Sequence, residues 1–215
     1  MTKQPTPHLS VDDAEPTLVA ALTAAFPAPE DQVAALRRTL TERADAEGLL
    51  DVAHRTVDSP LGPLLVAVSE QGLVRVAFEL EGHDSVLAQL ADAVSPRILA
   101  SAPRTDTVAR QLDEYFAGTR RTFDLRVDLQ LVSGFRREVI EHLPAIAYGT
   151  TESYAQVARA AGNPKAVRAV GSACGHNPVP VVVPCHRVVR SDGSMGQYLG
   201  GVEAKATLLA LEGAA

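Results

Sequence analysis

Residues 153–175 read SYAQVARAAGNPKAVRAVGSACG and predict two short helices joined at a glycine. The first helix is expected over residues 153–161 and is broken at Gly162. Asn163 is a good N-cap residue, and Pro164 suits the first position of a second helix. Two short helices at this spacing are typical of a helix-turn-helix.

The second of these helices is expected over residues 165–174, with Gly175 as its C-terminal stop. Most of its residues are small, so its backbone can approach a surface closely, and Lys165 and Arg168 are its two largest polar residues. Residues 155–191 carry five bases and no acid, which leaves a net charge of −11 for the rest of a chain whose total is −6. A basic face on an acidic body is what local contact with phosphate requires. The five bases are Arg159, Lys165, Arg168, Arg187 and Arg190.

Downstream, Pro184-Cys185-His186-Arg187 follows an apolar run, Val179–Val183, that should be buried. The thiolate is the nucleophilic form of cysteine, and a neighbouring base makes it available near neutral pH. A lone cysteine is more often a small buried hydrophobe, so the dipeptide alone does not establish catalysis.

The N-terminal half shows strand and helix patterns that predict an α+β layer. Residues 1–50 are expected to be a tail followed by one helix over residues 31–46, with no chemistry of their own. Turn residues and short apolar runs over 54–80 predict a hairpin. Two amphipathic helices should follow, near residues 84–94 and 105–116. Residues 123–129 suggest a further strand. We therefore expect three parts: residues 1–50, an α+β domain over 51–130, and a helical domain over 131–215.

Composition limits the class of protein. Two cysteines, Cys174 and Cys185, are too few for a disulfide framework or a cysteine-rich zinc site, which favours a reducing compartment. No apolar run approaches the roughly 18 residues of a membrane span, and the N-terminus lacks an apolar signal core.

The spacing of residues 148–213 closely resembles the O6-alkylguanine-DNA alkyltransferases, also called methylated-DNA–protein-cysteine methyltransferases. The resemblance is carried by Asn177-Pro178-Val179-Pro180, Pro184-Cys185-His186-Arg187-Val188, the glycine-rich stretch 196–201 and the C-terminal run 205–213, and it extends in outline back to residue 54. It implies a small ribonuclease-H-like domain followed by a winged-helix-like DNA-binding domain that carries the cysteine. It also implies irreversible, single-turnover transfer of an alkyl group from O6 of guanine to Cys185, after the base has been flipped out of the duplex.

The resemblance assigns roles residue by residue. His186, through a water, would take the thiol proton of Cys185, Glu212 would orient His186, and Tyr154 would protonate the leaving guanine. Arg168 would fill the gap in the base stack, and Lys165, Ala166, Ala169 and Ser153 would complete the DNA contact. The remaining matched positions are expected to form the substrate pocket: Asn177, Pro180, Val188, Gly196, Tyr198 and Leu199.

The same resemblance implies double-stranded DNA containing O6-alkylguanine as the partner, with O4-alkylthymine as a second candidate lesion. It implies a monomer and no cofactor. Some relatives bind a structural zinc, but this chain has no cysteine before Cys174, so we expect no metal here. We also expect no membrane contact and a cytoplasmic location, at the nucleoid when the protein is bound to DNA. This chain departs from the family pattern at Gly134–Ile140 and lacks tryptophan, which concerns packing more than chemistry.

Three other functions are weighed from the residues alone. A Cys-His-Glu thiol hydrolase would turn over repeatedly and would need an oxyanion hole. A protein that only binds or senses alkylation damage would not need the cysteine, which is present. A redox sensor would need a resolving cysteine, and Cys174, expected to be a buried structural thiol, is the one candidate.

Overall fold

The computed structural model describes residues 29–214, in which the part from residue 44 onward forms one compact unit and residues 29–43 belong to another. Helix α2 (Glu30–Ala46) crosses the boundary between the units and confirms the helix expected near residues 31–46. The tail expected before it lies mostly outside the described residues.

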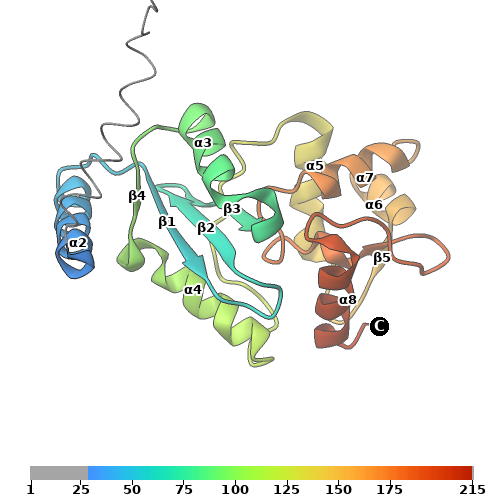
Figure 1. The fold of residues 1–215 in the computed structure, drawn as a ribbon. Helices are drawn as coiled ribbons and strands as arrows, with labels where there is room; N and C mark the ends of the chain where they lie inside the picture. Colours follow the sequence, from blue (N-terminus) through green and yellow to red (C-terminus); the bar gives the residue numbers. More distant parts are fainter. Residues whose placement is uncertain (1–28, 215) are drawn as a thin grey trace, which may run out of the picture. The chain divides into compact units, whose positions relative to one another are not determined.

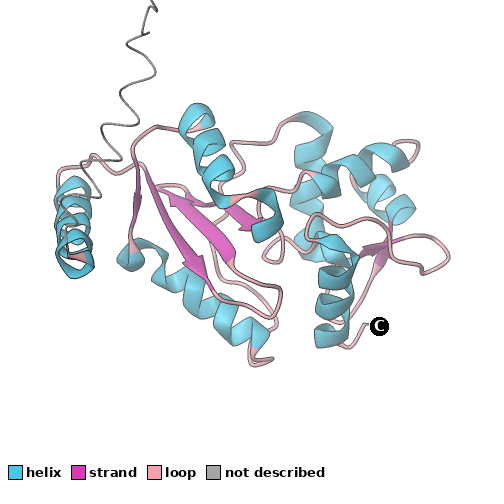
Figure 2. Ribbon diagram, viewed as in Figure 1, coloured by secondary structure: helices cyan, strands magenta, loops and turns pink. Residues whose placement is uncertain are grey.

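A four-stranded sheet forms the centre of the first half of the compact unit (Figures 1 and 2). Its order is β3 (Gly72–Phe78), β2 (Leu64–Ser69), β1 (Val52–Val57) and β4 (Ile98–Ala100). The β2–β1 and β2–β3 pairs are antiparallel, as a hairpin pattern predicts, and β4 runs parallel to β1.

Both faces of this sheet are covered, which explains the uninterrupted apolar run in β2. Leu64 and Val66 point into the larger core, which they share with helix α4 (Ala102–Phe116). Leu65 and Ala67 point into a smaller core with helix α3 (His83–Ala93). These two helices confirm the amphipathic pair expected in this region.

The strand predicted over residues 123–129 is wrong. Only Val127 pairs, as an isolated bridge to Leu73, and the remaining backbone follows another course. The side chain of Gln111 on α4 bonds both the N–H and the carbonyl of Asp124, at 2.8 and 2.9 Å, so this residue satisfies its backbone polar groups without a sheet partner. Strand β4 was not predicted, because a three-residue strand carries too short a pattern.

The second half of the compact unit is mainly helical (Figure 2). It contains α5 (Gly134–His142), α6 (Tyr154–Ala160), α7 (Val167–Gly175) and α8 (Gly201–Glu212), and the first three pack against one another. Between them, β5 (Glu152–Ser153) pairs in parallel with β6 (Val188–Val189). The helix-turn-helix is therefore α6 and α7, with a two-residue ladder beside it.

The start of α7 differs from the sequence prediction. Asn163 is not its N-cap: the carbonyl of Asn163 accepts from the N–H of Ala166 at 3.0 Å, and the helix begins at Val167. Pro164 thus occupies the second position of a turn, a position that favours the fixed φ of proline. The helix ends at Gly175, as predicted.

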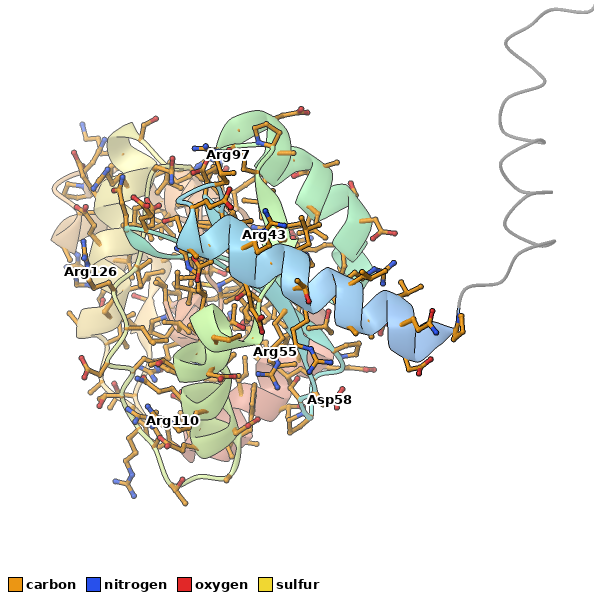
Figure 3. All side chains as sticks on the ribbon, turned by 90° about the vertical axis from the view of Figure 1, so that its left-hand side faces the viewer. Arg43, Arg55, Asp58, Arg97, Arg110 and Arg126 are labelled. Carbon is orange, nitrogen blue, oxygen red and sulfur yellow. The ribbon has the colours of Figure 1, made fainter. Side chains whose placement is uncertain are left out.

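The two halves of the unit share one continuous core and are joined through the backbone as well. The N–H of Val76 on the edge strand β3 donates to the carbonyl of Pro178 at 2.9 Å. On the face shown in Figure 3, Arg55, Arg97 and Arg110 are each ion-paired with an acid, so they do not form a free basic surface.

Candidate active site

Cys185 begins a single 3-10 turn (Cys185–Arg187) and is only 1% exposed. All thirteen residues from Asn177 to Val189 are buried, which confirms the burial expected for the apolar run before the cysteine. Burial removes water from the thiolate and raises the pKa of Cys185 to about 11. At neutral pH only roughly one thiol in ten thousand would then be ionised unaided, so any chemistry at this sulfur needs a base.

The side chain of Asn177 holds the turn that carries the thiol. Its Oδ1 accepts from the N–H of Val179 at 3.0 Å, and its Nδ2 donates to the carbonyl of Val183 at 2.8 Å and to Sγ of Cys185 at 3.1 Å. Val181, at the centre of this turn, has a φ of 73°, a strained value for a β-branched residue that persists only when its surroundings enforce it. Asn177 thus stabilises both the strained turn and negative charge on sulfur.

The tautomer of His186 follows from its partner. Nε2 of His186 lies 2.9 Å from Oε1 of Glu212, and both side chains are fully buried. The carboxylate can only accept, so Nε2 carries the hydrogen and Nδ1 keeps its lone pair. Nδ1 has no hydrogen-bond partner within the described residues, and burial lowers the pKa of His186, so the ring is a neutral base at pH 7.

Glu212, the last residue of α8, is held as an anion. The hydrogen bonds of His186, Arg187 and Tyr115 overcome the effect of burial and lower its pKa from 4.5 to about 2. Arg187 donates Nε to Oε2 at 2.8 Å and Nη2 to Oε1 at 2.9 Å. Arg187 is itself buried, which corrects its assignment to the basic face: it neutralises Glu212 instead.

Lys205 on α8 is a buried cation that begins the matched C-terminal run 205–213 and for which no role was predicted. It is fully buried and donates from Nζ to the carbonyl of Val188 at 2.5 Å. Its charge lowers the pKa of the Cys185 thiol, against the larger effect of burial. The position of Lys205 within the run that resembles the family hinted at a role. The sequence could not show that this lysine is buried.

Tyr154 stands at the first residue of α6 and borders an open cavity of about 570 Å³. Gly196, Tyr198 and Leu199 line the same cavity, together with Gly171 of α7. A Cβ at Gly196 would lie 2.2 Å from the Tyr154 hydroxyl, so only glycine lets this loop pass so close. Four of the residues expected around the substrate are therefore adjacent.

The other expected pocket residues lie deeper. Pro180 and Val188 are buried, and Val188 belongs to β6, where its carbonyl holds Lys205. The hydroxyl of Tyr198 is buried without a hydrogen-bond partner in the described part of the chain. Its ring packs edge-on against His186, with centroids 6.3 Å apart, and against Phe78 of β3 at 5.7 Å.

The expected DNA contacts lie mostly on an accessible surface of α7 and the turn before it. Lys165, Arg168 and Ala169 are exposed and Ala166 is half-buried. Ser153 is the N-cap of α6: its Oγ accepts from the N–H of Gln156 at 3.3 Å, and Gln156 bonds back to its N–H in a capping box.

Neither a metal cluster nor a membrane helix emerges from the described part of the chain. Residues 29–214 hold no group of three or more histidine, cysteine or acidic side chains placed to bind a metal ion. No helix in that range is both long and apolar enough to cross a bilayer. Cys174 is a free buried thiol on α7, as expected, and burial raises its pKa strongly.

Comparison with known proteins places both halves of the compact unit. Residues 52–129 match the ribonuclease-like domain of 6-O-methylguanine DNA methyltransferase, and residues 134–214 match its DNA-binding domain. The methylated-DNA–protein-cysteine methyltransferase of Mycolicibacterium paratuberculosis is 41% identical over 161 residues, covering 75% of this chain and 92% of the relative. The chain belongs to the 6-O-methylguanine DNA methyltransferase family.

Other members of this methyltransferase family are similarly close. The constitutive Bacillus subtilis enzyme of the same name is 38% identical over 160 residues, covering 74% of this chain and 94% of the relative. The crystal structure of Mycobacterium tuberculosis OGT in complex with DNA matches with a TM-score of 0.64 at 36% identity, covering 75% of this chain and 92% of that one. The predicted architecture of a sheet domain followed by a helical DNA-binding domain is thereby confirmed.

Proposed function

We propose that this protein repairs alkylated DNA by transferring the alkyl group from O6 of guanine in a duplex to Sγ of its own Cys185. Membership of the methyltransferase family supports this function, as does the M. tuberculosis relative, whose structure contains DNA. The observation that carries it is a buried thiol, bonded by Asn177, beside a neutral His186 whose tautomer Glu212 fixes. The partner is double-stranded DNA, and the lesion is O6-alkylguanine, with O4-alkylthymine as a second candidate.

The chemistry balances with groups on this chain and one water. Nδ1 of His186 takes the thiol proton through that water, and Asn177 and Lys205 stabilise the thiolate. The thiolate forms a bond to the alkyl carbon as the bond from that carbon to O6 breaks. Tyr154, beside the cavity, donates its proton to the guanine that keeps the electron pair. Because burial raises the pKa of Tyr154, the hydroxyl is protonated and ready to donate at neutral pH.

The product is a stable thioether that is not cleaved, so Cys185 is not regenerated and each molecule acts once. A thiol hydrolase would instead turn over repeatedly, and the number of turnovers therefore distinguishes the two functions. Mixed with excess duplex containing O6-methylguanine, the protein should remove one methyl group per molecule and then stop. Continued turnover would favour hydrolysis, and binding with no methyl loss would favour a damage-sensing protein.

We propose that α7 enters the DNA and that Arg168 fills the space left by the flipped nucleotide. Arg168 is exposed on the helix beside Lys165 and Ala169, where small neighbours let the backbone approach the groove. We further propose that the tail with α2, the ribonuclease-like part and the DNA-binding part act as three units, that the protein works as a monomer, and that it resides in the cytoplasm at the nucleoid.

Arg168→Ala should slow transfer from duplex DNA by about tenfold, because the unstacked state loses part of its compensation. Transfer from the free base O6-benzylguanine, which needs no flipping, should stay within about twofold of the unmodified protein. Single-turnover rates on the two substrates give the comparison, with Arg110→Ala, an exposed ion-paired arginine of α4, as the control. Equal slowing on duplex and free base would contradict this role.

A further inference from the structure

Tyr115 brings the ribonuclease-like domain into the hydrogen-bond network of the active site. It lies on α4, in the matched domain that does not contain Cys185, and its hydroxyl donates to Oε1 of Glu212 at 2.6 Å. Its side chain is completely buried. The ring packs against those of Phe116, Phe123 and Tyr148, with centroids 5.1 to 6.3 Å apart, so the hydroxyl has one fixed position.

The same carboxylate oxygen is shared between Tyr115 and the proposed base. Oε1 of Glu212 accepts from Tyr115, from Nε2 of His186 and from Nη2 of Arg187, whereas Oε2 accepts from Nε of Arg187 and, at 3.4 Å, from the N–H of Gly149. Three donors on one oxygen divide its negative charge among them. The phenol therefore limits how strongly Glu212 attracts a proton to His186.

We propose, on the basis of the alkyl transfer proposed above, that Tyr115 is a positioning residue which fixes Glu212 and keeps His186 neutral at the pH where the protein works. The shared oxygen places the effect on the base and not on the thiol. The bond joins residues 97 positions apart and crosses between the two matched domains, so the ribonuclease-like domain completes the catalytic hydrogen-bond chain.

Burial and the charges of Arg187 and Lys205 also lower the pKa of His186, and Tyr115 adds to them by weakening the pull of Glu212. Arg187 also neutralises Glu212, through Nε and Nη2, while its Nη1 donates to the carbonyl of Ile146 at 2.6 Å. Lys205 from α8 and Tyr198 from the covering loop do not donate to Glu212. Tyr148 donates to the carbonyl of Leu211 at 3.0 Å. Burial and the adjacent carboxylate raise the pKa of Tyr115 far above its ordinary value, so it remains a donor at every relevant pH.

Tyr115→Phe and Tyr148→Phe form a matched pair for the test. Each removes one phenol hydroxyl from the same aromatic cluster, but only the first removes a bond to Glu212. The pKa of His186 is measured by NMR of protein labelled with ¹⁵N-histidine, with the signal assigned by His186→Gln. Single-turnover transfer from O6-methylguanine duplex is measured across the same pH range.

In Tyr115→Phe the proton affinity of His186 should rise about tenfold, because Oε1 keeps more of its charge. The acidic limb of the pH–rate profile should therefore move to higher pH by about one unit. On that limb the transfer rate should fall about tenfold, and at higher pH, where His186 is neutral in both proteins, the rate should fall less. Tyr148→Phe should change neither quantity by more than about twofold.

An unchanged pKa of His186 in Tyr115→Phe, or a rate lowered equally at every pH, would overturn the role of Tyr115 while leaving alkyl transfer in place. Absence of transfer in the unmodified protein would instead remove the proposed function, and the NMR titration would still report whether Tyr115 tunes His186.

Discussion

Replacing Cys185 with alanine should abolish alkyl transfer completely while the protein keeps its affinity for duplex DNA. The substitution removes the sulfur that accepts the alkyl group. Binding should persist because the exposed residues of α7, including Arg168, are unchanged. Transfer is followed by loss of O6-methylguanine from a labelled duplex, and binding by fluorescence anisotropy of the same duplex.

Cys174→Ala is the control for this substitution. Cys174 is the second free thiol of the chain and is also buried, but it lies on α7 and is followed directly by Gly175, not by a histidine. Its replacement removes one sulfur from the core and should leave the extent of transfer unchanged. Two outcomes would contradict the assignment of Cys185 as the acceptor. One is loss of methyl groups from DNA mixed with Cys185→Ala, and the other is a Cys174→Ala variant that no longer transfers while Cys185→Ala still does.

Replacing Glu212 with glutamine should slow transfer by about 100-fold or more and destabilise the fold by roughly 3 kcal/mol. The amide no longer dictates the tautomer of His186, so Nδ1 is not reserved as the base. The guanidinium of Arg187 is left buried without its counter-charge. The rate is measured in single turnover, and the free energy of unfolding by urea denaturation.

Glu203→Gln removes the same charge from the exposed face of the same helix and should change both quantities little. The stability difference at Glu212 should also depend on pH. Because folding lowers its pKa from 4.5 to about 2, its contribution is fully present above about pH 4.5 and is lost as the pH falls toward 2. A Glu212→Gln variant with unchanged rate, or a stability difference that widens in acid, would contradict this network.

Much of the architecture could be predicted because the relevant signals are local. The hairpin β2–β3 shows short apolar runs separated by Gln71-Gly72, and α6 shows helical spacing bounded by Ser153 and Gly162. Predictions failed where tertiary contacts override local pattern. The segment at residues 123–129 looks like a strand, yet it meets β3 only at the single bridge between Val127 and Leu73, and Gln111 on α4 bonds the backbone of Asp124.

The candidate site could be predicted as a set of residues but not as an arrangement. The pairing of His186 with Glu212 was expected from the family resemblance and is present at 2.9 Å. Arg187 was expected on the DNA surface, because nothing in a sequence distinguishes a buried ion pair from an exposed arginine. Tyr115 was missed because its bond to Glu212 joins positions that only the folded chain brings together.

The most direct test of the central claim is to locate the transferred group. The protein is mixed with one equivalent of duplex containing a single O6-methylguanine, digested, and mapped by mass spectrometry. Fragment-ion mapping of residues 169–187, the tryptic peptide that holds both cysteines, should place one methyl group on Cys185 and none on Cys174, with one lesion lost per methylated protein. Repair of the DNA with no methyl group on Cys185 would contradict direct transfer to this thiol.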